Sequence, residues 1–108
     1  MSVCVLSSEE EFDSMKKLDC VIYFTAMWCG PCRNISPHYV TLANKYVDLK
    51  FAKVDVDELN TEDILSVPTF RVYKDGNIVD ELIGADAIAL ESLIVRNSIN
   101  SSNRATDL

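Results

Sequence analysis

Two cysteines, Cys29 and Cys32, form the C-x-x-C pair of this chain, a spacing that suits either metal binding or thiol–disulfide exchange. An apolar run before the pair and a helical pattern after it place Cys29 where a strand ends and a helix begins. The free N–H groups and the dipole of a helix start favour the thiolate of Cys29. Cys32 follows one turn later, close enough for a disulfide. We expect Cys29 to be reachable, to attack a client disulfide, and Cys32 to resolve the mixed disulfide.

The residues around the pair fit the same chemistry. Trp28 places a flat apolar surface beside the first sulfur, which suits docking of a client segment. Gly30 allows other backbones to approach closely. Pro31 fits the first turn of a helix, where no N–H donor is needed, and it stiffens the turn.

Two other interpretations of the pair remain open. A zinc site usually needs four ligands, but the chain has no second C-x-x-C and a single histidine, His38, on the same predicted helix. A structural disulfide suits small secreted domains better than a chain without a leader. The two remaining cysteines, Cys4 and Cys20, are isolated among apolar residues, and we interpret them as small thiols without a role in exchange.

Composition and charge restrict the possible partners. The 108 residues suffice for one domain, and 48% hydrophobic with 25% charged residues is typical of a globular protein. The net charge of -7 repels phosphate backbones and anionic lipids, which argues against nucleic acid or membrane as the main partner. No apolar stretch approaches the ~20 residues of a membrane span. Glu9, Glu10 and Glu11 stand where a signal peptide needs a basic start and an apolar run, so we expect no signal peptide here. We therefore expect a cytoplasmic protein.

The elements that must position the pair follow from apolar patterning and turn signals. We expect strands at 2–6, 20–26, 50–56, 69–73 and 78–83. We expect helices at 9–17, from the turn at 28–32 to about 46, at 58–65 and at 86–99. Ser8 and Glu11 form a capping box before the first helix, and Asp75-Gly76 predicts a hairpin.

The resulting order is β-α-β-α-β-α-β-β-α, which predicts an α/β fold with a mixed central sheet flanked by helices. Residues 1–98 form the domain, and residues 99–108, rich in Ser and Asn, are expected to be a flexible polar tail. We expect a monomer.

Two motifs closely resemble the thioredoxin family. The first is Trp-Cys-Gly-Pro-Cys at 28–32, directly after the apolar run at 21–27, and the second is Val67-Pro68-Thr69. Together with the element order, the resemblance covers about residues 2 to 98. It implies a thioredoxin fold and reduction of protein disulfides without a metal or bound cofactor. It also implies that electrons come from a flavoprotein thioredoxin reductase that uses NADPH.

The resemblance also assigns roles to single residues. Pro68 is expected to follow a cis peptide bond and to face the active site, and Val67 is expected to offer backbone groups to the client. Gly84 and Ala85 match the family's last loop that faces the client. Together with Trp28, Gly30 and Pro31, they are expected to bind the client.

The chain departs from the family at two places. Tyr23 stands where most thioredoxins have a buried aspartate that serves as a base for the resolving cysteine, and a phenol, with an ordinary pKa near ~10, is a poor base at pH 7. Lys53 matches the lysine that usually pairs with this acid. We hypothesise that Tyr23 hydrogen-bonds Lys53 and that both support catalysis; alternatively, Tyr23 only fills the cavity. The stretch between Asp57 and Pro68 is about one helical turn shorter than family members usually have, so the helix at 58–65 should be shortened or irregular.

These departures leave alternatives to a protein-disulfide reductase. The chain could be a thioredoxin-like binding or scaffold subunit with weakened catalysis. It could also be a disulfide isomerase or oxidant, if Tyr23 alters the redox potential.

Overall fold

Five strands and three helices make up the described part of the chain, residues 2–61 and 63–106 of a computed structural model, with side chains through Ser98. The strands are β1 (Val3–Val5), β2 (Cys20–Thr25), β3 (Lys50–Asp55), β4 (Thr69–Lys74) and β5 (Asn77–Ile83), and the helices are α1 (Glu9–Lys16), α2 (Gly30–Lys45) and α3 (Ala87–Thr106). Among these residues, no helix is long and apolar enough to cross a membrane.

The strands form one mixed sheet in the order β1-β3-β2-β4-β5. β3 runs parallel to both β1 and β2, whereas β4 runs antiparallel to β2 and β5 runs antiparallel to β4. β2 lies in the centre and is buried on both faces along nearly its whole length, as its continuous apolar sequence predicts. This arrangement confirms the predicted α/β architecture.

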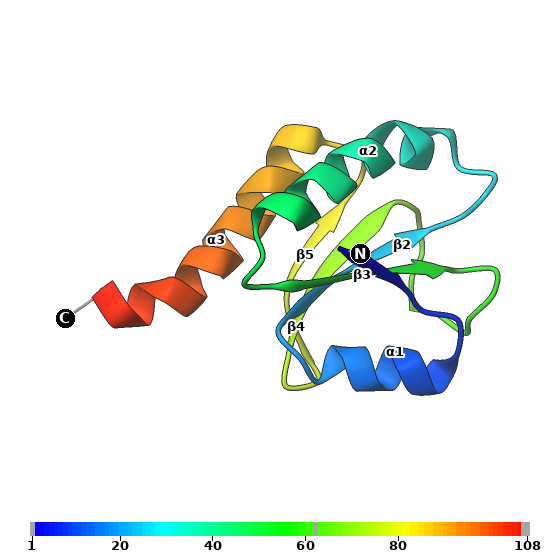
Figure 1. Cartoon of the computed structure of the whole chain (residues 1–108). Coiled ribbons are helices and arrows are strands. Elements are labelled where there is room, and N and C mark those ends of the chain that lie inside the picture. Colours follow the sequence, from blue (N-terminus) through cyan, green and yellow to red (C-terminus); the bar gives the residue numbers. More distant parts are fainter. Residues whose placement is uncertain (1, 62, 107–108) are drawn as a thin grey trace.

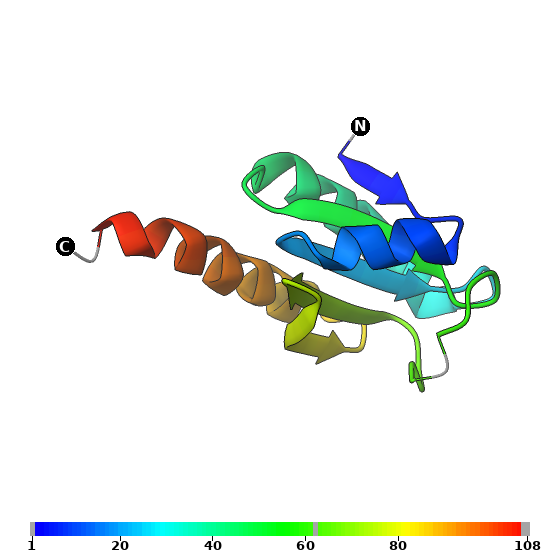
Figure 2. The ribbon, with the colours of Figure 1, turned by 90° about the horizontal axis from the view of Figure 1, so that it is seen from below.

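Helices cover both faces of the sheet. α1 lies on one face, and α2 and α3 lie side by side on the other (Figure 1). The larger core lies between the sheet and α2 with α3, and it includes Tyr23, Tyr39 and Phe70. The smaller core lies under α1, where Phe12 and Met15 pack against it. The view from below shows α1 across the sheet and the end of α3 extending away from it (Figure 2).

Two local sequence signals are confirmed in atomic detail. The Ser8 hydroxyl caps α1 by accepting the N–H of Glu11 at 3.1 Å, although the Glu11 carboxylate reaches the N–H of Ser7 instead of that of the capping residue. At the turn between β4 and β5, Asp75 and Gly76 both adopt positive φ angles, 54° and 85°. Two such residues form the hairpin turn whose twist matches that of the strands.

The helix predicted at 58–65 is absent, since none of residues 58–61 and 63–65 is helical; the N–H groups of Glu58, Leu59 and Ile64 close only short turns there. Leu59 and Thr61 are buried and Ile64 is half-buried, whereas Leu65 is exposed. Burial at the second, fourth and seventh positions of 58–65 does not follow one face of a helix. The observed order is therefore β-α-β-α-β-β-β-α, with no helix among the described residues between β3 and β4.

α3 continues to Thr106, beyond the end expected at residue 99. Residues 99–106 have helical backbone, and 107–108 lie outside the described residues. The division into a domain at 1–98 and a flexible tail at 99–108 stays a prediction.

Asp80 on β5 links the sheet to α3. Its carboxylate accepts two hydrogen bonds from the Arg96 guanidinium, at 2.8 and 3.1 Å, and one from the Asn97 amide at 2.9 Å. These donors hold the pKa of Asp80 below its ordinary value, with the Arg96 guanidinium as the main cause.

The lowered pKa of Asp80 gives a pH-dependent stability. The stabilisation is fully present above the ordinary pKa of an aspartate, ~3.9, and is lost as the pH falls through the lowered pKa of the folded state. We expect Asp80→Asn to reduce the free energy of unfolding by about 1 kcal/mol at pH 7 and by much less below about pH 3. Urea denaturation at both pH values measures this. Asp75→Asn is the control, since Asn tolerates the same positive φ angle. An equal loss of unfolding free energy for Asp80→Asn at both pH values would contradict the prediction.

Candidate active site

The turn after β2 places Cys29 at the start of α2. The backbone N–H of Cys29 donates to the carbonyl of Ala26 at 3.1 Å, which closes the turn. Cys29 then caps the helix, and its Sγ accepts the backbone N–H of Cys32 at 3.2 Å. Gly30 and Pro31 form the first turn of the helix, as the sequence predicts. The sulfur thus lies at the positive end of the helix dipole, where a thiolate is stabilised.

Cys29 and Cys32 are joined by a disulfide, with their Cα atoms 5.3 Å apart, so the structure is the oxidised form. Cys32 is buried, and Cys29 retains only 3% of its surface exposed. Cys29 is therefore less open than the exchange reaction led us to expect.

Trp28 lies beside this opening and is 67% exposed. Its indole N–H donates to a carboxylate oxygen of Asp57 at 2.9 Å. This bond holds an exposed ring in one orientation. The sequence analysis does not single out Asp57 as a site residue, so it missed this contact. Its position in the sequence could have indicated the contact, because Asp57 follows β3, and the end of β3 lies next to the end of the parallel strand β2, which precedes Trp28.

A second segment completes the site. The Val67–Pro68 peptide bond is cis, as expected, and the Val67 carbonyl oxygen lies 3.7 Å from Sγ of Cys29. The N–H of Gly84 donates to the carbonyl of Pro68 at 2.9 Å, with the exposed Ala85 next in the chain. The fold therefore brings together four residues that are far apart in sequence: Cys29, Val67, Pro68 and Gly84.

The predicted hydrogen bond between Tyr23 and Lys53 is wrong. The Tyr23 hydroxyl donates to the carbonyl of Cys32 at 2.9 Å and lies 2.8 Å from the hydroxyl of Ser36. Ser36 also donates to the same carbonyl at 2.8 Å. Tyr23 and Lys53 are neighbours across β2 and β3, but the phenol reaches over to α2. The sequence analysis missed Ser36 because its contact with the Tyr23 hydroxyl depends on how α2 packs on β2.

The Tyr23 ring also fills the space under the active site, as the alternative interpretation holds. It stacks on Phe70 with ring centroids 4.8 Å apart and packs against Tyr39 at 5.0 Å. The first turn of α2 therefore rests on packed aromatic rings.

Lys53 and Cys32 border the same cavity. The cavity has a volume of about 320 Å³. Its lining consists of Thr25, Ala26, Met27, Cys32, Arg33, Ser36, Lys53 and Asp55.

The other two cysteines stand apart from this chemistry. Cys20 is buried, and burial raises the pKa of its thiol to about 12, so it is protonated at neutral pH. Cys4 is exposed on the edge strand β1. In the part of the chain that the structure describes, no three His, Cys, Asp or Glu residues are close enough to hold a metal ion.

A mixed sheet between helices, with a redox-active disulfide at a helix start beside a cis-proline, defines a thiol–disulfide oxidoreductase. The thioredoxin family model matches residues 3–96, and the chain belongs to that family.

Relatives and solved structures agree with this membership. Thioredoxin 1 of Plasmodium falciparum is 44% identical over 98 residues, covering 85% of this chain and 94% of the relative. The mitochondrial thioredoxin O2 of Arabidopsis thaliana is 41% identical over 105 residues, covering 86% and 66%. The solution structure of oxidised Plasmodium falciparum thioredoxin has a TM-score of 0.83 and 43% identity, covering 90% of this chain and 99% of that one. The chain is accordingly a protein-disulfide reductase.

The shared carbonyl of Cys32 predicts coupling between Tyr23 and Ser36. In Tyr23→Phe or Ser36→Ala, one hydroxyl still bonds the carbonyl, whereas the double variant loses both donors. We expect the double variant to lose about 1 kcal/mol more unfolding free energy than the sum of the single variants. Denaturation of the oxidised protein measures this coupling.

Tyr39→Phe is the matched control. Its hydroxyl donates to the carbonyls of Val21 and Ala52 and shares no partner with Ser36. Its combination with Ser36→Ala should be additive, and additivity for Tyr23→Phe as well would contradict the coupling.

Proposed function

We propose that Cys29 is the nucleophile and Cys32 the resolving thiol in the reduction of protein disulfides. The observation that carries this assignment is the position of Sγ of Cys29, which caps α2 and accepts the N–H of Cys32. A helix start lowers the pKa of a cysteine there, and the thiolate is the attacking species.

The reaction proceeds in two exchanges. The Cys29 thiolate attacks one sulfur of the client disulfide, and the other client sulfur leaves as a thiolate and takes up a proton. Cys32 then loses its proton and attacks Sγ of Cys29, which releases the second client sulfur as a thiol. The client gains two electrons, and the Cys29–Cys32 pair ends as a disulfide, the state of this structure.

Three residues support this chemistry in our proposal. Lys53 lines the cavity beside Cys32, through which the proton of Cys32 leaves. Tyr23 holds the carbonyl of Cys32, and Pro68 keeps the Val67 carbonyl near Cys29.

The client binds along the surface around Cys29. We assign this surface to Trp28, Gly30, Pro31, Val67, Gly84 and Ala85. The exposed Trp28 ring supplies apolar contact, and the backbone of Val67 pairs with an extended client segment.

A partner must supply the electrons that regenerate the dithiol. We propose a flavoprotein thioredoxin reductase that uses NADPH, so that the chain takes part in electron transport and cell redox homeostasis without a cofactor of its own. We propose that it acts as a monomer in the cytoplasm; its relatives include a mitochondrial thioredoxin as well as Thioredoxin 1.

A Cys32→Ser variant tests the roles of the two cysteines. Without the resolving thiol, the mixed disulfide persists, so we expect covalent complexes with client proteins that reducing agent dissociates. Non-reducing electrophoresis and mass spectrometry detect them and locate the bond at Cys29. The Cys29→Ser variant is the control and should form none; capture through its Cys32 would reverse the assignment.

Coupling to the reductase is measured separately. The oxidised protein, mixed with a flavoprotein thioredoxin reductase, should consume equimolar NADPH, followed by absorbance. The Cys29→Ser/Cys32→Ser double variant should consume none. Reduction by glutathione with no NADPH consumption through the reductase would contradict the proposed electron donor.

A further inference from the structure

The chain between β3 and β4 leads directly to the active site but has little regular structure. Residues 56–61 and 63–68 contain no helix or strand. Leu59 and Ile64 pack into the core under α1, whereas Leu65 is almost fully exposed. The segment ends at Val67, whose carbonyl lies 3.7 Å from Sγ of Cys29. Its position therefore sets one wall of the site.

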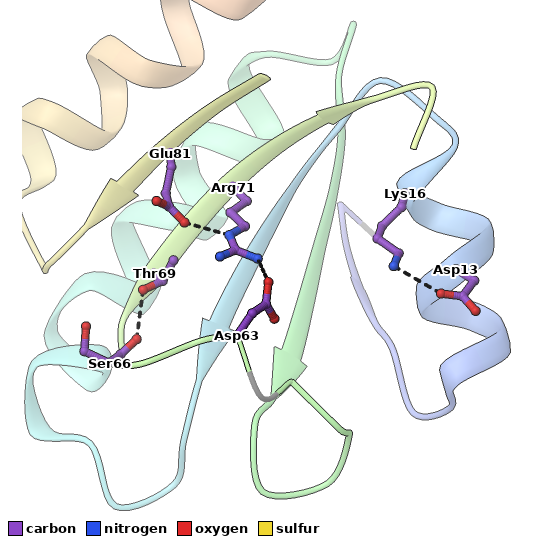
Figure 3. Close-up of polar contacts among 7 residues, drawn as sticks. All are labelled: Asp13, Lys16, Asp63, Ser66, Thr69, Arg71 and Glu81. Carbon is purple, nitrogen blue, oxygen red and sulfur yellow. Dashed lines mark hydrogen bonds and ion pairs between the residues drawn. The ribbon is translucent and has the colours of Figure 1, made fainter. Parts of the chain in front are cut away.

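Arg71 on β4 reaches this segment from the sheet. Its Nη1 donates to Oδ2 of Asp63 at 2.7 Å, and its Nε donates to Oε2 of Glu81 on β5 at 2.6 Å (Figure 3). Only 11% of the Arg71 side chain is exposed. Because the guanidinium is planar and bonded on both sides, it presents Asp63 with a donor in a fixed direction.

Two hollows adjoin this ion pair. One, of about 430 Å³, is bounded by Phe12 and Tyr73, and the other, of about 160 Å³, is bounded by Leu65 and Ile83. Asp63 and Arg71 line both hollows. The ion pair thus borders both hollows and joins the segment to the sheet next to the packed Leu59 and Ile64.

We propose that Arg71 is a positioning residue for the reaction, which holds Asp63 and so keeps the Val67 backbone in place for docking of the client at Cys29. Val67 lies four residues after Asp63. The other end of the segment is fixed by the Thr69 hydroxyl, which donates to the carbonyl of Ser66 at 2.8 Å, and by the bond between Gly84 and Pro68.

This role predicts a selective defect. A protein disulfide needs the Val67 backbone, whereas a small disulfide needs only the sulfur of Cys29. Release of Asp63 should therefore raise KM for the protein and leave kcat and the small substrate unaffected.

The chain offers a closely matched pair of variants. Asp63→Asn removes the charge that pairs with Arg71, at a side chain that is 69% exposed. Asp13→Asn removes a charge that pairs with Lys16 within α1, at a side chain that is 66% exposed. The substitution, the change in net charge and the exposure are alike, and both pairs appear in Figure 3. Only the first holds the segment before Val67.

The assay compares insulin with hydroxyethyl disulfide, each reduced with dithiothreitol as the electron source. We expect Asp63→Asn to raise KM for insulin by ~3- to 5-fold, with Asp13→Asn near wild type and the small disulfide unchanged for both. Asp63→Glu keeps the charge and should restore most of the affinity. At 1 M salt the difference between the two Asn variants should shrink, because the exposed carboxylate is screened.

Two results would overturn the proposal: equal KM values for Asp63→Asn and Asp13→Asn with insulin at low salt, or an equal loss of rate with both substrates. Amide hydrogen exchange gives a second criterion, since residues 63–67 should exchange faster in Asp63→Asn alone. The inference rests on the proposed roles of Cys29 and Val67. Failure of the wild-type protein to reduce insulin would refute those roles, whereas an active wild type with indistinguishable variants would refute only the role of Arg71.

Discussion

A sulfur atom takes the place of the oxygen that usually caps a helix, and the chemistry of the molecule depends on it. Serine, aspartate and asparagine are the common caps because their oxygens accept an N–H of the first turn. At α2 the Sγ of Cys29 accepts that bond from Cys32. The contact that completes the helix start therefore also stabilises the thiolate, and it sets the resolving cysteine one turn away.

The surroundings hold this helix start from two sides. Beneath it, Tyr23 packs among Phe70 and Tyr39 while its hydroxyl bonds the carbonyl of Cys32, so a buried ring and a polar contact act on the same turn. Beside it, the cis Val67–Pro68 peptide brings a carbonyl oxygen near the first sulfur. The sulfur pair is thus fixed by the core on one face and by a connecting segment on the other.

The strands, the helix starts and the hairpin could be predicted because each has a local cause: an apolar run, a capping serine, or Asp75-Gly76. The cysteine pair and the cis-proline followed from short motifs. The partner of Tyr23 could not be predicted, because alternation along β2 fixes the face of the ring but not which polar group on α2 its hydroxyl meets. The missing helix at 58–65 was mispredicted since polar residues there suited a helix, whereas the spacing of Leu59, Thr61 and Ile64 did not.

The stretch between β3 and β4 rests on a few anchors, while the sulfur pair and its aromatic support belong to the core between the sheet and α2. In our proposal that stretch supplies one wall of the client surface, and Trp28, Gly30 and Pro31 supply the wall beside the sulfur pair. Within that stretch the exposed Leu65 can be substituted without removing a buried side chain, whereas Leu59 and Ile64 pack in the core and Val67 lies beside Cys29. New client preferences can therefore evolve at the client surface while the reaction of the sulfur pair stays the same.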